Sequence, residues 1–263
     1  MLEGKNTRGI TERALKYDLT IPFARYVAIN HQQLALPFKR YQIQPVWRAD
    51  RPQKGRYREF YQCDADVAGS AASLNEIEFI CIYHQVFTRL GIKDYALKIN
   101  SRKILAALAE KLGDADKLTD IAVAIDKLDK IGLAKVREEL TDKGLTNSQV
   151  EDIARYLSVE GTNEEKLSQL ELLLGEPGKE GIAGLRLILE KTGLVQPEAA
   201  VQIDLTLARG LNYYTGIIFE AKAPESVKIG SIGGGGRYDD LTGLFGVPGI
   251  PGAGISFGVD RIY

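Results

Sequence analysis

The order of segment types along the 263 residues constrains the fold more than any single motif. Residues 1–100 mix strand-like and helical segments, residues 101–197 show only helical periodicity, and residues 198–263 return to strands, glycines and aromatic residues. This order differs from the regular strand–helix alternation of a parallel βαβ fold. It predicts an α+β fold, in which one sheet domain is built from the first and last regions and is interrupted by a helical insertion domain.

The first region contains three strand-like runs, at 36–47, 57–68 and 92–100, with one clear helix between the last two. Ser73 and Glu76 match the S-x-x-E pattern of a capping box at the N-terminus of that helix. The helix should end at a glycine. Its buried apolar stripe would consist of Ile77, Ile80, Cys81, His84, Phe87 and Leu90.

The composition argues against several classes of protein. No run of about 18 apolar residues is present, so no membrane span is expected. Two cysteines, Cys63 and Cys81, cannot form a disulfide framework and indicate a reducing compartment, which predicts a cytoplasmic protein. The two histidines, His31 and His84, lack a Cys/His ligand spacing, which argues against a zinc site and against a histidine triad.

Residues 45–63 (PVWRADRPQKGRYREFYQC) carry the strongest functional signal. Pro52 and Gly55 interrupt the segment, so we expect a strand, a loop and a second strand. Charge runs are usually solvated hairpin tips. So many like charges around one turn repel each other unless an anion joins them, which favours a loop that grips a polyanion. The five basic residues, which fall within eleven positions, are Arg48, Arg51, Lys54, Arg56 and Arg58.

The expected strand at 57–68 has two different faces, because side chains alternate along a strand. The face that looks like core is formed by Tyr57, Tyr61, Cys63, Ala65 and Val67. The opposite face is either exposed to solvent or the floor of a binding site, and the neighbouring arginines favour the floor. This polar face is formed by Arg58, Phe60, Gln62, Asp64 and Asp66.

The segment RALKYDLTIPFARY places Asp18 and Thr20 one alternation apart, just before Pro22. A carboxylate and a hydroxyl on the same side could accept hydrogen bonds from an ammonium group. The same residues before a proline also commonly form a turn. The segment by itself supports both interpretations equally.

The segment LARGLNYYTG contains an arginine in an apolar and aromatic strand region. A buried guanidinium needs an anionic partner, so Arg209 would contact a ligand or a protein carboxylate such as Asp204. Tyr213 and Tyr214 would point to opposite faces of this strand, so at least one of them should flank the site.

Two glycine-rich segments follow. GSIGGGGRYDD lacks the strand–GxGxxG–helix context of a Rossmann site and the GK[ST] of a P-loop. Its four consecutive glycines, Gly233 to Gly236, indicate that a ligand or another strand approaches the backbone closely. GAGISFGVDRI predicts a strand entering a helix whose first turn offers Arg261 and the positive end of a helix dipole.

Together these segments resemble the catalytic core of class II aminoacyl-tRNA synthetases, specifically the histidyl-tRNA synthetase family. VWRADRPQKGRYREF resembles motif 2 of that class and GAGISFGVDRI resembles motif 3. ARGLNYYTGIIFE and GGGGRYDDL resemble the two histidine signatures, and KYDLTIPFARY and FYQCDAD resemble the amino-acid-binding segments. The resemblance implies an antiparallel sheet flanked by helices, with a helical insertion between motifs 2 and 3.

The resemblance implies that one end of the site holds L-histidine. The α-ammonium group would be held by Asp18, Thr20 and Gln62. The imidazole would be recognised by Asp66 and Tyr214, with Tyr213 beside them. A carboxylate that accepts the imidazole N–H rejects isosteres lacking it, because a buried polar group would be left unpaired.

The resemblance also implies an ATP site. Arg48 would contact both the substrate carboxylate and the α-phosphate, and Phe60 would stack on adenine. Arg56 and Arg58 would hold the bent triphosphate, and Arg261 would cover the adenine and the γ-phosphate.

Catalysis would rest on electrostatics, because the histidine carboxylate is already ionised when it attacks the α-phosphorus. Arg48 and Arg209 would be the catalytic arginines. Arg51 and Lys54, at the loop tip, would meet the acceptor end of tRNA-His. Mg²⁺ would enter with ATP, and the resemblance implies neither zinc nor dedicated protein ligands for a metal.

No counterpart of motif 1, which builds the class II dimer interface, is found, and the chain stops where the motif 3 helix begins. We therefore expect a catalytic core fragment of a protein that is a homodimer at full length. Paralogues that bind without aminoacylating remain an alternative. These include the regulatory subunit of ATP phosphoribosyltransferase and the synthetase-like sensor domain of an amino-acid-starvation kinase. A structural RNA-binding module would explain the basic loop but not Arg209 or the glycine-rich strands.

Overall fold

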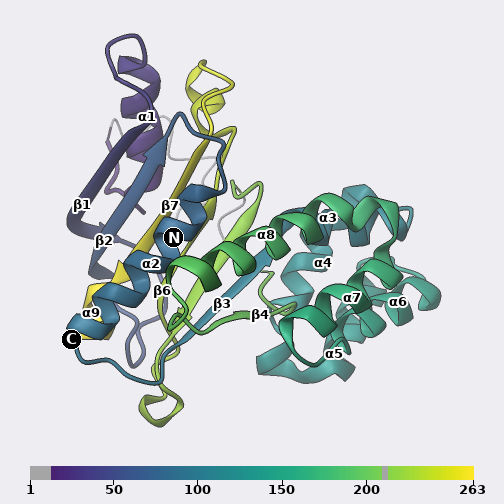
Figure 1. Ribbon diagram of the computed structural model, residues 1–263. Helices are drawn as coiled ribbons and strands as arrows, with labels where there is room; N and C mark the ends of the chain where they lie inside the picture. Colours follow the sequence, from purple (N-terminus) through teal and green to yellow (C-terminus); the bar gives the residue numbers. More distant parts are fainter. Residues whose placement is uncertain (1–12, 209–212) are drawn as a thin grey trace.

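The computed structural model describes residues 13–208 and 213–263 (Figure 1). A seven-stranded sheet organises the chain, in the spatial order β1-β2-β7-β6-β5-β3-β4. Neighbouring strands are antiparallel except for β3 and β4, which are parallel. The strands are β1 (Phe38–Trp47), β2 (Glu59–Ala68), β3 (Ala96–Ser101), β4 (Val201–Ile203), β5 (Ile217–Lys222), β6 (Ser231–Arg237) and β7 (Gly252–Gly258).

Helices flank this sheet, as the sequence predicts. Those outside the central helical segment are α1 (Thr20–Asn30), α2 (Leu74–Arg89) and α9 (Val259–Ile262). Between β3 and β4 the chain forms α3 (Arg102–Lys111), α4 (Leu118–Ile125), α5 (Leu128–Asp142), α6 (Asn147–Leu157), α7 (Asn163–Leu174) and α8 (Lys179–Val195). In Figure 1, α2 crosses one face of the sheet, while α3 to α7 gather beside it. Short 3₁₀ turns are η2 (Ala115–Lys117), η3 (Glu176–Gly178), η4 (Glu225–Val227) and η5 (Leu241–Phe245).

The sheet and the helical segment share one continuous set of buried apolar side chains. Under α2, the ring of Tyr83 lies 4.8 Å from that of Phe257 on β7, and the ring of Phe87 lies 5.6 Å from it. Ile121 and Leu185, from the helical segment, are fully buried in the same cluster. The apolar stripe of α2 therefore fixes the helix on the sheet by packing.

The N-terminus of α2 differs from the expectation. Ser73 makes no side-chain capping hydrogen bond, so the predicted capping box is wrong. The carboxylate of Glu76 is instead buried against the guanidinium of Arg237, with Arg237 Nε 2.5 Å from Oε1. An ion pair to a distant strand has taken the place of the local cap. Leu90, expected in the buried stripe, is 58% exposed.

Strand register builds a polar row across the middle of the sheet. On β7, Ser256 lies directly between Asp64 of β2 and Gly234 of β6, and β5 continues the row with Glu220. Side chains of one row share a face. The polar face predicted for 57–68 is therefore part of a surface that spans four strands.

The glycines of β6 and β7 allow these strands and side chains to approach closely, as the sequence predicts. A Cβ on Gly235 would collide with the backbone of β7, and one on Gly254 would collide with the carboxylate of Asp66. A Cβ on Gly236 would lie 2.8 Å from the Tyr214 ring. In this part of the sheet a larger residue would displace either a strand or a neighbouring side chain.

Candidate active site

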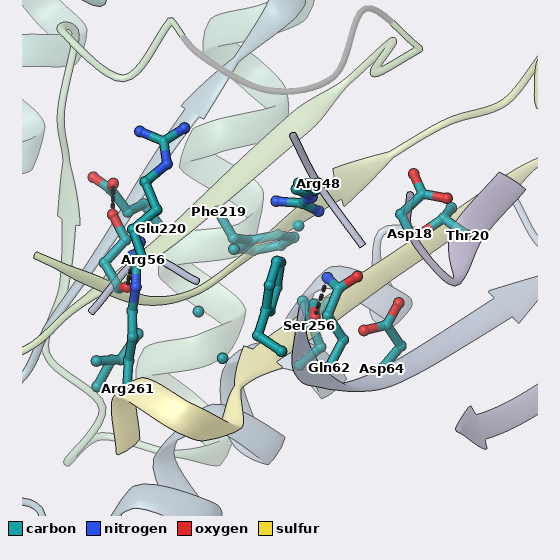
Figure 2. A pocket seen from close by; sticks show the side chains of 18 of the residues that line it. Asp18, Thr20, Arg48, Arg56, Gln62, Asp64, Phe219, Glu220, Ser256 and Arg261 are labelled. Carbon is teal, nitrogen blue, oxygen red and sulfur yellow. Dashed lines mark hydrogen bonds between the residues drawn. The ribbon is translucent and has the colours of Figure 1, made fainter. Parts of the chain in front are cut away.

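One pocket of about 540 Å³ opens over this polar face. Its walls come from the segment before α1, the loop between β1 and β2, the strands β2, β5, β6 and β7, and the start of α9. Asp126 and Lys130 of the helical segment also reach its lining. In Figure 2, Asp18, Thr20, Gln62 and Asp64 lie toward one end, and Arg56 and Arg261 lie toward the other.

At the first end, Asp18 and Thr20 lie at the start of α1 and are both buried. Asp18 Oδ1 accepts a hydrogen bond from the backbone N–H of Ile21 at 3.1 Å. Its other oxygen, Oδ2, accepts one from the hydroxyl of Tyr213 at 3.2 Å. The turn interpretation of this segment is confirmed, and the same turn presents Asp18 to the pocket, where its binding of an ammonium group stays a prediction.

Tyr213 and Tyr214 lie together, which contradicts the expectation that they point to opposite faces. Their rings meet edge to face with centroids 4.9 Å apart, and both line the pocket. The reason is that the described residues of 207–216 belong to no strand, so side chains do not alternate there. Arg209, predicted as a catalytic residue, lies outside the described residues. Its alternative partner Asp204 forms an ion pair with Lys98.

Asp66 is buried and, unlike Asp18 and Asp64, does not line the pocket; it contacts two residues that the sequence did not single out. Arg40 Nη2 lies 2.8 Å from its carboxylate, and the Tyr238 hydroxyl donates to Asp66 Oδ1 at 2.6 Å. Burial raises the pKa of Asp66 to about 6, against the lowering effects of Arg40 and Tyr238. Tyr238 follows the GGGGR run directly, so that motif contained its signal, whereas Arg40 requires the β1–β2 register.

Gln62 and Asp64, both on β2, line the pocket. Gln62 Nε2 donates to Ser256 Oγ at 2.9 Å. Burial, and then the nearby Asp66, raise the pKa of Asp64 to about 7. Asp64 and Ser256 were not predicted as site residues, although Asp64 lies on the predicted polar face.

In the centre of the pocket, Arg48 lies against aromatic rings. Its guanidinium carbon is 5.0 Å from the centroid of the Phe60 ring and 4.4 Å from that of Tyr17. Its Nε donates to the Tyr17 carbonyl at 3.2 Å. The structure thus brings together Arg48 and Phe60, as a cation beside a flat ring.

At the second end, a loop and a helix are tied together by arginines. Arg56 Nε lies 2.9 Å from Asp50 Oδ2, and Arg58 Nε donates to the Asp50 carbonyl at 3.4 Å. Arg261 Nε donates to the Gly55 carbonyl at 2.5 Å. Arg56 and Arg261 line the pocket, whereas Arg58 lies outside its lining.

The tip of the same loop is exposed. Arg51 and Lys54 both face solvent, and neither lines the pocket. This placement agrees with the expected strand–loop–strand arrangement, in which β1 ends at Trp47 and β2 begins at Glu59. The two charges are available to a partner that approaches the pocket from outside.

Within 13–208 and 213–263, no group of three or more His, Cys, Asp or Glu side chains is arranged to hold a metal ion. None of the helices in these ranges is long and apolar enough to cross a membrane.

Comparisons with known proteins agree with the geometry. The family model described as "Histidyl-tRNA synthetase" matches residues 11–262. The "Histidine--tRNA ligase" of Phocaeicola vulgatus is 56% identical over 254 residues, which cover 96% of this chain and 56% of that protein. The protein of the same name from Bacteroides fragilis is 57% identical over the same length. The chain thus spans about half the length of the curated relatives it matches.

Solved structures give the same result. The histidyl-tRNA synthetase of Nostoc sp. PCC 7120 matches with a TM-score of 0.83 at 34% identity, covering 95% of this chain and 58% of that one. A Bacillus halodurans structure titled as an ATP phosphoribosyltransferase regulatory subunit/histidyl-tRNA synthetase matches with a TM-score of 0.80 at 24% identity, a likeness of fold alone. On the family match and the identity to its relatives, the chain belongs to the histidyl-tRNA synthetase family.

Proposed function

We propose that this chain forms the catalytic core of a histidine–tRNA ligase, which activates L-histidine with ATP and transfers it to the 3′ end of tRNA-His. The observation that carries the proposal is the distribution of charge in one pocket, whose second end holds the carboxylates of Asp50 and Glu220 as well as arginines. Buried carboxylates gather at one end and arginines at the other, with Arg48 between them. A zwitterionic amino acid and a polyphosphate would fit these two ends.

The acidic end would hold the amino acid. Asp18, Thr20 and Gln62 offer acceptors for its α-ammonium group. Asp66, with Tyr214 and Tyr213 nearby, would accept the imidazole N–H. A buried carboxylate is stabilised when a cationic or N–H donor enters beside it, which supports a ligand with donors at two positions.

The basic end would hold ATP. Adenine would stack on Phe60, while Arg56, Arg58 and Arg261 would contact the phosphates. The histidine carboxylate would be directed at the α-phosphorus by Arg48, and Arg48 with Arg209 would stabilise the charge that develops on the phosphoryl oxygens. These residues need no general base, because the attacking carboxylate is already ionised.

Mg²⁺ would come with ATP, neutralising charge on its phosphates and favouring departure of pyrophosphate. The second end carries guanidinium donors, which contact phosphate oxygens and do not ligate metals, together with the carboxylates of Asp50 and Glu220. Mg²⁺ would be held chiefly by the nucleotide phosphates, without a dedicated set of protein ligands.

Further parts of the proposal concern the whole protein. Arg51 and Lys54 would meet the tRNA acceptor end, and the helices of 101–197 would form an insertion domain between two parts of the catalytic core. A homodimer is supported by the edge strand β1, which exposes Tyr41 and Ile43. A cytoplasmic location is supported by two cysteines that are free thiols.

The experiment is charging of tRNA-His with labelled L-histidine, using the chain extended to the length of its relatives. The proposal predicts ATP-dependent charging with histidine alone. Histidine binding without charging would favour the non-aminoacylating paralogue. In the same assay, Arg209→Ala should lose adenylate formation while histidine binding stays near normal.

A further inference from the structure

The side-chain amide of Gln62 has one partnered end and one unpartnered end. Its Nε2 donates to Ser256 Oγ at 2.9 Å, as the dashed line in Figure 2 marks. Its Oε1 is shielded from solvent and accepts no hydrogen bond from any described residue. A buried acceptor without a partner is costly, so this oxygen is suited to meet a donor on a ligand.

The orientation of this amide follows from its hydrogen bond to Ser256. Ser256 lies on β7, in the polar row directly opposite Asp64 of β2. Its hydroxyl oxygen accepts from the NH₂ end of Gln62, so the carbonyl end of the amide faces away from Ser256.

We propose that Ser256 is a positioning residue for the amino-acid site, because its hydroxyl oxygen holds the NH₂ end of Gln62 and so turns the Gln62 carbonyl toward the α-ammonium group of the bound amino acid. The inference rests on the proposed function, since it takes L-histidine as the ligand. It adds a residue that acts through Gln62.

The opposite orientation of the Gln62 amide would weaken ligand binding. If the amide rotated by half a turn, its NH₂ group would face the ligand ammonium, and two donors would oppose each other. Ser256→Ala removes the acceptor that prevents this rotation. We expect the variant to bind L-histidine about tenfold more weakly, the effect of one lost hydrogen bond to a charged group.

A ligand without the ammonium group separates positioning from general damage. The probe is 3-(imidazol-4-yl)propionate, which keeps the imidazole and the carboxylate. Ser256→Ala should bind this probe as the unaltered chain does, because no ammonium then meets the amide. Equal weakening for both ligands would overturn the proposal and indicate a structural role.

A double-mutant cycle tests whether Ser256 acts through Gln62. Calorimetry would give the dissociation constant of L-histidine for Ser256→Ala, Gln62→Ala and the double variant of the 263-residue chain. The proposal predicts that Ser256→Ala has no further effect once Gln62 is alanine. Independent, multiplying effects would overturn it.

Two more variants complete the experiment. Ser256→Thr keeps the hydroxyl oxygen that accepts from Gln62 and should restore histidine binding. Ser158→Ala, at an exposed position after α6, is the control and should bind as the unaltered chain does.

The outcomes separate the two proposals. If the unaltered chain binds L-histidine and the Ser256→Ala variant binds it with the same affinity, this inference is overturned and the proposed function still stands. An unaltered chain that binds no L-histidine would overturn both.

Discussion

Arg237 of β6 and Glu76 of α2 form a buried, two-point ion pair, with Nε 2.5 Å from Oε1 and Nη2 2.7 Å from Oε2. The same guanidinium donates to the carbonyls of Ser70 and Ala72 and to Asp239. It therefore joins the segment before α2 to the strand that carries the glycine run. In the sequence, Arg237 is followed directly by Tyr238, whose hydroxyl donates to Asp66 at the candidate site.

Removing one partner of this pair should destabilise the fold. Glu76→Ala leaves a buried guanidinium without its carboxylate, which typically costs about 3–5 kcal/mol of unfolding free energy. Urea denaturation would measure the change. The control is Glu78→Ala on the same helix, whose partner Lys39 is 54% exposed and whose own side chain is 41% exposed. That variant should lose less than about 1 kcal/mol, and equal losses for the two variants would contradict the account.

The hydroxyl of Tyr238 should support the recognition of histidine. Tyr238→Phe removes the hydrogen bond that Asp66 accepts at 2.6 Å, and with it a group that favours the ionised carboxylate. We expect the dissociation constant of L-histidine to rise roughly tenfold, with ATP binding unchanged, both measured by calorimetry. Tyr95→Phe, which removes a hydroxyl near His84, is the matched control. An unchanged affinity in Tyr238→Phe would separate this tyrosine from ligand binding.

The buried Asp64 should make stability depend on pH. Burial and the neighbouring Asp66 raise its pKa from 3.8 to about 7, with Arg40 lowering it and Asp18 raising it. Between about pH 4 and pH 7 the folded protein keeps a proton on Asp64 that the unfolded chain has released. The unfolding free energy therefore falls as the pH rises from 4 to 7 and stays at its lower value above pH 7.

Asp64→Asn removes that dependence. Without ligand, the unfolding free energy of the variant minus that of the unaltered chain should be roughly 3 kcal/mol larger at pH 8 than at pH 4. Urea denaturation at the two pH values provides the measurement. The same difference between variant and unaltered chain at both pH values would show that Asp64 titrates normally.

Two neighbouring glycines should respond differently to the same substitution. Gly234 lines the pocket and a Cβ there would have no neighbour closer than 3.5 Å, so Gly234→Ala should fold but fill ligand space and weaken ATP or histidine binding. Gly235→Ala would collide with the backbone of β7 and should lower the melting temperature sharply. Thermal melts and calorimetry would decide, and a Gly235→Ala variant as stable as Gly234→Ala would contradict the strand packing.

The sequence predicted those parts of the site that depend on local pattern. The alternation of 57–68 placed Gln62, Asp64 and Asp66 on one face, and the register puts Asp64 in the polar row. The prediction that Tyr213 and Tyr214 point to opposite faces was wrong, because side chains alternate only inside a strand. Predictions of which face a side chain occupies were therefore right inside a strand and wrong outside one.

Other features were beyond local pattern because they depend on register between distant segments. Ser256 meets Gln62 across 194 residues of sequence, and Tyr238 meets Asp66 across 172. Glu76 matched a capping box by sequence, yet it pairs with Arg237, 161 residues away. A buried guanidinium without a carboxylate would cost more than a lost cap, which explains why the distant partner prevails.

The most direct test of the account is ATP–pyrophosphate exchange by this chain, measured with each of the amino acids in turn. The account predicts exchange with L-histidine and with no other amino acid, because the two ends of the pocket are proposed to bind an imidazole-bearing amino acid and ATP together. Exchange with a different amino acid would contradict it. So would the absence of exchange from the chain extended to the length of its relatives.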